Sequence, residues 1–180
     1  TDKTGTITEN RMEIYECYDL HTDRTYSRED LKDPSLTEII STAMWASESV
    51  PFDSMEQAIH TLYAATARSD QRPFFKMIHE YPLEGKPPMM THIFENERRS
   101  RIIACKGAPE RLLEQSALSI AQKARLTEIN STFAKQGLRV LAVANAVFEG
   151  DKFPENELDY ILNLLGIIGF YDPPKNNIAE

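Results

Sequence analysis

The pattern of apolar and polar residues along the chain alternates between strand periods and helix periods. Partial alternation from Arg11 to Tyr18 predicts a strand. Apolar residues then recur at helical spacing after Ser35, which suits the N-terminal cap of a helix. A second helix is predicted from Ser54 to about Ala67. Asp53 and Glu56 have the spacing of a capping box at its start, with Asp in place of the usual Ser or Thr.

The second half of the chain is rich in strand patterns. Apolar strands are predicted at residues 75–83, 89–94, 100–106, 138–147 and 164–170. Helices are predicted at 109–114 and 120–135, and Gly137 suits the end of the second. We also expect Phe74 and Phe75 to be core residues. Hairpins and segregated helices together predict an α+β fold, in which helices flank an antiparallel β-sheet.

Composition narrows the classes of partner. The net charge of −8 repels nucleic acid and anionic membranes, so neither is expected to bind. A nucleotide site on such a surface has to concentrate positive charge locally. Cys17 and Cys105 are too few for a disulfide framework, and no apolar run approaches the roughly 18 residues of a membrane span. The histidines show no metal-ligand spacing with each other or with the cysteines; they are His21, His60, His79 and His92.

The strongest chemical signal is the run Asp-Lys-Thr-Gly-Thr-Ile-Thr-Glu-Asn from Asp2 to Asn10. A carboxylate such as that of Asp2 can attack a phosphoryl group and form an acyl-phosphate. Lys3 and the Thr4 hydroxyl supply the cation and the donor that a transferring phosphoryl group needs. The alternative for a shorter run would be a polar turn that leads into a strand.

This run resembles the phosphorylation signature of P-type ATPases, with Asp2 at the acceptor position. Three further stretches resemble family motifs in the family's order, so that the resemblance covers essentially the whole chain. They are the acidic segment Asp53–Ile59, the lysine motif Lys106–Glu110 and the hinge-like Asp172–Lys175. The resemblance implies a phosphorylation motif and first hinge at 1–10, a nucleotide-binding domain at 11–170, and a second hinge at 171–180. Both chain ends fit this expectation of a piece bounded by hinges.

The resemblance assigns Glu56 to the adenine amino group, and both this role and helix capping can hold at once. Lys106 follows an apolar strand that would deliver its ammonium to the sheet edge, and Gly107 leaves room for a base or ribose. A solvated strand-end lysine is the alternative. Arg139 is similar to the family's arginine near the phosphates; its alternative is an ordinary edge-strand arginine.

Two positions depart from the family pattern. The aromatic ring that stacks on adenine in many members is replaced by Leu83, and a second lysine by Pro88. Leucine gives apolar contact without ring stacking, so we expect weaker adenine affinity. Tyr81 compensates only if the register is off by two, which would keep it on the same strand face as Leu83.

The resemblance therefore implies an ATP-binding domain of a cation-transporting pump, which uses Mg²⁺. Its expected nucleotide contacts are Asp53, Glu56, Leu83, Lys106, Gly107, Arg139 and Asp172. In the full pump, Asp2 and Thr4 would also contact Mg²⁺. The expected partners are the phosphorylation, actuator and transmembrane domains of the same pump, with this cytoplasmic piece itself monomeric.

The transported ion is invisible in this piece, because its ligands would lie within the membrane. The Lys-Gly-Ala-Pro-Glu motif at 106–110 favours calcium as a first choice. We expect the chain to bind ATP without hydrolysing it, since no segment resembling the family's Mg²⁺-holding aspartates follows residue 175. Two other classes stay open. One is a non-catalytic interaction module of pump ancestry; the other is a phosphatase with an aspartate nucleophile, although such enzymes usually carry Asp-x-Asp.

Overall fold

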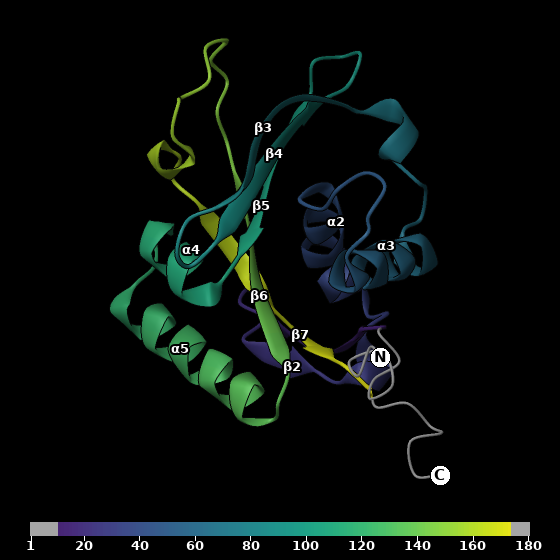
Figure 1. Ribbon diagram of the computed structural model, residues 1–180, viewed down its shortest axis with the longest axis vertical. Coiled ribbons are helices and arrows are strands. Elements are labelled where there is room, and N and C mark those ends of the chain that lie inside the picture. The colour runs from purple at the N-terminus through teal and green to yellow at the C-terminus, as the bar shows by residue number, and fades with distance from the viewer. Residues whose placement is uncertain (1–10, 174–180) are drawn as a thin grey trace, which may run out of the picture.

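Residues 11–173 are described by the computed structural model, and their centre is one antiparallel sheet of seven strands (Figure 1). The strand order is β2-β1-β7-β6-β5-β4-β3, and every neighbouring pair is antiparallel. The strands are β1 (Glu13–Asp19), β2 (Arg24–Tyr26), β3 (Lys76–Glu84), β4 (Met89–Glu95), β5 (Arg101–Gly107), β6 (Arg139–Ala146) and β7 (Asn163–Tyr171). The α+β prediction is confirmed.

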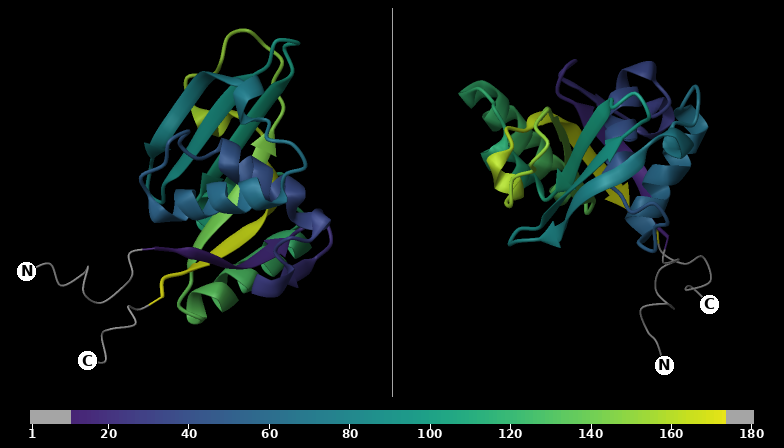
Figure 2. Two further views of the ribbon diagram at one scale, coloured as in Figure 1. Left: turned by 90° about the vertical axis from the view of Figure 1, so that its right-hand side faces the viewer. Right: turned by 90° about the horizontal axis from the view of Figure 1, so that it is seen from above.

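Four α-helices flank this sheet within the described part of the chain. They are α2 (Thr37–Trp45), α3 (Ser54–Thr66), α4 (Pro109–Gln115) and α5 (Ile120–Lys135). Short 3₁₀ turns complete the fold: η1 (Arg28–Asp30), η2 (Pro34–Leu36), η3 (Arg72–Phe74) and η4 (Glu157–Asp159). Figure 1 shows α2 and α3 on one face of the sheet and α4 and α5 on the other. Figure 2, viewed on its left from the side of α2 and α3, shows those two helices crossing in front of the strands.

Each face of the sheet has its own apolar core. The core under α2 and α3 contains Leu36, Ile39, Ile40, Met44, Trp45, Val143, Ile168 and Phe170. The core under α4 and α5 contains Leu112, Leu126, Ile129, Phe133, Ile103, Ala142 and Ile167. Strand residues alternate between the two cores because successive side chains point to opposite faces. Burial on both faces explains why the strands β4, β5 and β7 read as apolar runs.

Local signals in the sequence set most helix ends. In α5, Ser119 and Gln122 form a complete capping box, and Gly137 follows with a φ of 81°. The expected cap at Ser35 is wrong. Asp33 is the cap, since its side chain accepts from Ser35 N at the start of η2, and α2 begins only at Thr37. The three-residue 3₁₀ turn η2 therefore separates the capping residue Asp33 from the α-helix.

The core prediction fails for one of the two phenylalanines. Phe74 is 63% exposed at the end of η3. Phe75 is partly buried, with its ring centroid 5.3 Å from that of Trp45. The short edge strand β2 was not predicted, because three residues are too few to show a period.

The two ends of the described chain meet on neighbouring strands. Glu13 of β1 lies opposite Tyr171 of β7, so the chain enters and leaves this sheet at the same place. None of the helices in residues 11–173 is both long and apolar enough to cross a membrane.

Candidate functional site

The predicted lysine and glutamate form a buried ion pair between the sheet and α3. Ile102 and Ala104 of β5 face the core under α2 and α3, and Lys106 continues that alternation. Its Nζ lies 2.7 Å from Glu56 Oε2, and both residues are buried. Lys106 is therefore not a solvated strand-end lysine. A buried cation of this kind requires an anionic partner, which Glu56 supplies.

The start of α3 is built from half of the predicted capping box. Asp53 accepts from Met55 N at 2.6 Å and from Glu56 N at 3.4 Å, which makes it the N-cap. The carboxylate of Glu56 does not complete the box; it turns to Lys106 and also accepts from Glu48 N at 3.3 Å. Glu56, the third residue of α3, thus pairs with a residue of the sheet instead of capping the helix.

Leu83 shares the sheet face of Lys106 because of an irregularity in β3. Tyr81 pairs with Thr91, but Glu84 pairs with Met89, so one extra residue lies between them. Glu84 therefore faces the side of Met89, which belongs to the core under α4 and α5. Leu83, one residue earlier, faces the opposite side, and it is 62% exposed. An apolar side chain is thus presented to solvent on the face of the ion pair, two strands away from Lys106.

The expectation that Tyr81 shares a face with Leu83 is wrong. Tyr81 is buried in the core under α4 and α5, where its hydroxyl lies 2.9 Å from that of Tyr160. It also donates to the carbonyl of Pro154. The extra residue in β3 reverses the alternation between the two positions, so Tyr81 does not replace the missing ring.

Gly107 is required by the packing of strands. A Cβ at this position would lie 2.6 Å from Pro88 O and 2.7 Å from the Cα of Met89. The room expected there for a base or ribose is filled on that side by β4. Close backbone approach, rather than space for a ligand, explains the glycine.

Arg139 and Asp172 lie toward the end of the sheet where the chain enters and leaves. Arg139 is exposed at the start of β6, on the face of Lys106. Lys106 lies opposite Val143, four positions further along β6, which places Arg139 about 13 Å away. Asp172 follows β7 and is partly buried. Asp2, Lys3 and Thr4 lie outside the described residues.

A histidine for which the sequence showed no metal-ligand spacing lies beside the ion pair. His92 of β4 is fully buried, and its Nδ1 lies 3.0 Å from the carbonyl oxygen of Trp45. It faces the same side as Met90, which pairs with Lys106. An ionisable residue between the apolar residues of β4 was the available signal.

A second histidine, His60 of α3, holds the loop that follows α2. His60 Nε2 lies 2.9 Å from the carbonyl oxygen of Glu48, while Arg72 lies 3.0 Å from His60 Nδ1. Burial lowers the pKa of His60, and the Glu48 carbonyl opposes that shift. A neutral ring explains both contacts, because it donates to the carbonyl and accepts from the guanidinium. The backbone of the loop is thereby held at Glu48, whose carbonyl accepts from His60 and whose N–H donates to Glu56.

Comparison with protein families shows which family this fold belongs to. The model of the P-type ATPase cytoplasmic domain N matches residues 29–177 of this chain. The chain belongs to this family. Its sheet, flanked by helices on both faces, is the sheet of an N domain.

Individual relatives agree with the family match. A calcium-transporting ATPase of Bacillus subtilis (strain 168) is 32% identical over 117 residues, which are 59% of this chain and 13% of that protein. Calcium-transporting ATPase 1 of Bacillus cereus is 25% identical over 203 residues, covering 100% of this chain and 22% of that protein. Calcium-transporting ATPase 1 of Saccharomyces cerevisiae is 27% identical, covering 99% and 23%. This N domain thus spans less than a quarter of the length of these relatives.

Proposed function

We propose that this N domain binds ATP on the sheet face that carries Lys106 and presents the γ-phosphate to Asp2. The observation that carries the proposal is the buried pair of Lys106 and Glu56, with Leu83 exposed on the same face. Such a face offers one cation, one hydrogen-bond acceptor and one apolar surface, which suit a purine base.

The base end of the site would be formed by three elements. Leu83 of β3 supplies apolar contact to one face of the adenine ring. Glu56 at the start of α3 accepts from the adenine amino group, and Lys106 of β5 contacts the base or ribose. Gly107 keeps β4 and β5 close enough to hold Lys106 in place, and Asp53 fixes the start of α3 by capping it.

The phosphate end would lie toward the chain ends. ATP in extended form is long enough to pass from Lys106 to Arg139, which are about 13 Å apart along the sheet. The exposed guanidinium of Arg139 suits two-pronged contact with phosphate oxygens. Asp172 lies where the chain leaves the sheet, within the proposed second hinge. Bending at residues 6–11 and 169–175 would then carry the γ-phosphate to Asp2.

In the parent protein this transfer would drive the transport of a cation, with calcium as the first choice. Asp2, assisted by Lys3, would attack the γ-phosphoryl group and form an acyl-phosphate while the bond to ADP breaks and ADP leaves; Asp2 and Thr4 would contact Mg²⁺. The proposed partners are the phosphorylation, actuator and transmembrane domains of the same pump. The N domain itself would lie on the cytoplasmic side of the membrane and bind ATP without hydrolysing it.

A titration followed by backbone NMR tests this function. With Mg-ATP, we expect shifts at Glu56, Leu83, Lys106 and Arg139; with adenosine, we expect the first three only. No shifts at millimolar ATP would favour the second candidate, an interaction module of pump ancestry, which the replacements at Leu83 and Pro88 support. Stable, Asp2-dependent labelling by radioactive ATP would contradict the expectation that this chain does not react.

A further inference from the structure

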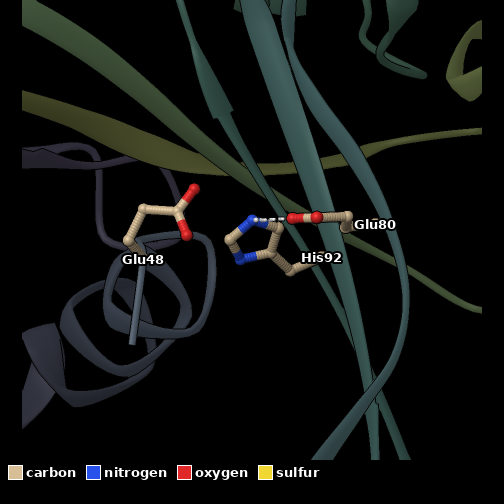
Figure 3. Close-up of side chains that lie close together, drawn as sticks. All are labelled: Glu48, Glu80 and His92. Atoms are coloured by element: carbon tan, nitrogen blue, oxygen red, sulfur yellow. Dashed lines mark ion pairs between the residues drawn. The ribbon is translucent and has the colours of Figure 1, made fainter. Parts of the chain in front are cut away.

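Three side chains from distant parts of the sequence converge beside the proposed nucleotide face. Glu48 follows α2, Glu80 lies on β3, and His92 lies on β4 directly opposite Glu80. One potential ligand atom from each lies within 4.8 Å of the other two. Figure 3 shows the carboxylates of Glu48 and Glu80 on either side of the His92 ring.

The hydrogen bond at Nδ1 of His92 sets which ring nitrogen carries the proton in the neutral ring. The Trp45 carbonyl can only accept, so His92 Nδ1, at 3.0 Å, donates to it. A neutral ring therefore has its lone pair on Nε2. That nitrogen is buried and has no hydrogen-bond partner among the described residues. Its nearest charged neighbour is Glu80 Oε2, at 3.6 Å.

This arrangement directs one nitrogen lone pair and two carboxylates at a common point. All three are acceptors, so they repel one another unless a cation lies between them. In metal-binding histidines, the N–H of the second ring nitrogen commonly donates a hydrogen bond to a carbonyl, as His92 Nδ1 does to Trp45. The site has both parts of that pattern: a ligand nitrogen whose lone pair has no hydrogen-bond partner among the described residues, and a carbonyl that fixes the ring.

We propose that Glu48, Glu80 and His92 form a binding site for a divalent transition metal of the zinc class. Imidazole with two carboxylates is a common ligand set for Zn²⁺, whereas Mg²⁺ prefers six oxygens. Ligand atoms around tetrahedral Zn²⁺ lie about 3.4 Å apart, and the 3.6 Å between His92 Nε2 and Glu80 Oε2 is close to that. Glu48 and Glu80 are exposed, so both carboxylates can move inward, and water can take the fourth position.

A bound metal would link the loop after α2 to the edge of the sheet. Glu48 N donates to Glu56, so the same loop contacts the partner of Lys106. The metal would thereby hold the loop that packs against the proposed adenine contact. This site does not depend on nucleotide binding, because none of its three ligands belongs to the proposed ATP contacts.

Titration of the nucleotide-free 180-residue chain with Zn²⁺ alone, followed by calorimetry, tests the site. We expect one equivalent to bind and to raise the melting temperature. Glu48→Gln and Glu80→Gln should each weaken binding at least about tenfold, and His92→Gln should abolish it. The surface variant His21→Gln should bind as the unaltered chain does, and millimolar Mg²⁺ should not compete.

Cobalt gives an independent readout, since Co²⁺ in a tetrahedral site absorbs strongly in the visible range. Because His92 is buried, the two exposed glutamate variants keep the test valid if His92→Gln fails to fold. Zn²⁺ affinity that is unchanged in both glutamate variants would overturn the proposal. So would the absence of saturable binding to the unaltered chain, which would leave the cluster as an ion pair of protonated His92 with Glu80.

Discussion

Lys106 Nζ lies 2.7 Å from Glu56 Oε2, and this contact joins the middle of the sheet to the first turn of α3. The two side chains are only 9% and 7% exposed. Burial of either charge without the other is costly, so each residue holds the other in place. A nucleotide that reaches this face therefore meets a preformed pair rather than a free cation. The same two residues act in folding and in the proposed recognition of ATP.

The pair should show strong coupling in unfolding experiments. Glu56→Leu alone leaves the Lys106 ammonium buried without a partner, and we expect a loss of about 3 kcal/mol in unfolding free energy. Glu56→Leu combined with Lys106→Met should recover most of that loss, because no charge then remains buried. Urea denaturation of the single and double variants measures the coupling.

An exposed ion pair provides the matched control. Arg28 lies 2.7 Å from Glu13, but their side chains are 54% and 30% exposed. Glu13→Gln should change stability by no more than about 0.5 kcal/mol. Equal losses of unfolding free energy in Glu56→Leu and Glu13→Gln would show that burial does not strengthen the contribution of the Lys106–Glu56 pair to stability.

Restoring a ring at residue 83 should strengthen nucleotide binding. Leu83→Phe adds a stacking surface on an exposed position, and we expect ATP to bind about 2–10-fold more tightly. Ile120→Phe, at the start of α5 and 90% exposed, is the control and should leave affinity unchanged. Fluorescence titration with an ATP analogue provides the measurement. If Leu83→Phe has no effect, the base does not lie against β3.

A side chain at residue 107 should separate β4 from β5. The Cβ in Gly107→Ala would meet backbone atoms at 2.6 and 2.7 Å, so we expect a loss of about 1–3 kcal/mol in thermal or urea unfolding. Gly137→Asn is the contrasting variant. Nothing lies within 4 Å of its Cβ, and asparagine tolerates the φ of 81°, so a change below about 0.5 kcal/mol is expected. Similar losses in both variants would exclude strand contact as the cause.

Stability should fall as pH rises through neutrality because of Glu157. Burial raises the pKa of this carboxyl from 4.5 to about 7, and the Thr91 hydroxyl, which donates at 2.8 Å, opposes the shift. The folded state then binds more protons than the unfolded state between these two values. The contribution of Glu157 to the free energy of unfolding is therefore fully present below about pH 4.5 and is lost as the pH rises through about 7.

Removing this titration should flatten the dependence on pH. Glu157→Gln should raise stability at pH 8 by an amount on the order of 1 kcal/mol, since partial exposure reduces the full effect. Asp159→Asn, an exposed acid in the same turn, should leave the profile unchanged. Melting temperatures between pH 4.5 and 8 measure both, and a profile of Glu157→Gln that parallels the unaltered chain would refute the assignment.

The sequence predicted elements whose signals are local. The helix at residues 120–135 has a cap, an amphipathic period and a terminal glycine, and all three appear in α5. Strands with apolar residues on both faces were also predicted to within about two residues. Lys106 was expected at the sheet edge, but it lies buried within the interior strand β5, on the same face as Ile102 and Ala104.

Features that depend on irregular or distant contacts were missed. The extra residue in β3 reverses the faces of Tyr81 and Leu83, which simple alternation cannot reveal. Pro82 was a usable signal, because proline within strands is confined to edges and bulges. Glu48 and His92 meet only because the loop after α2 packs on β4, and no spacing rule spans that separation.

Calorimetric titration with Mg-ATP tests the central claim most directly, with the Glu56→Leu/Lys106→Met variant as comparison, since it is expected to fold. Lys135→Ala, which removes an exposed lysine from α5, is the control. We predict saturable binding by the unaltered chain and by the control, and binding at least about tenfold weaker in the double variant. Equal affinity in all three proteins, or no binding by the unaltered chain at about 10 mM ATP, would contradict the account.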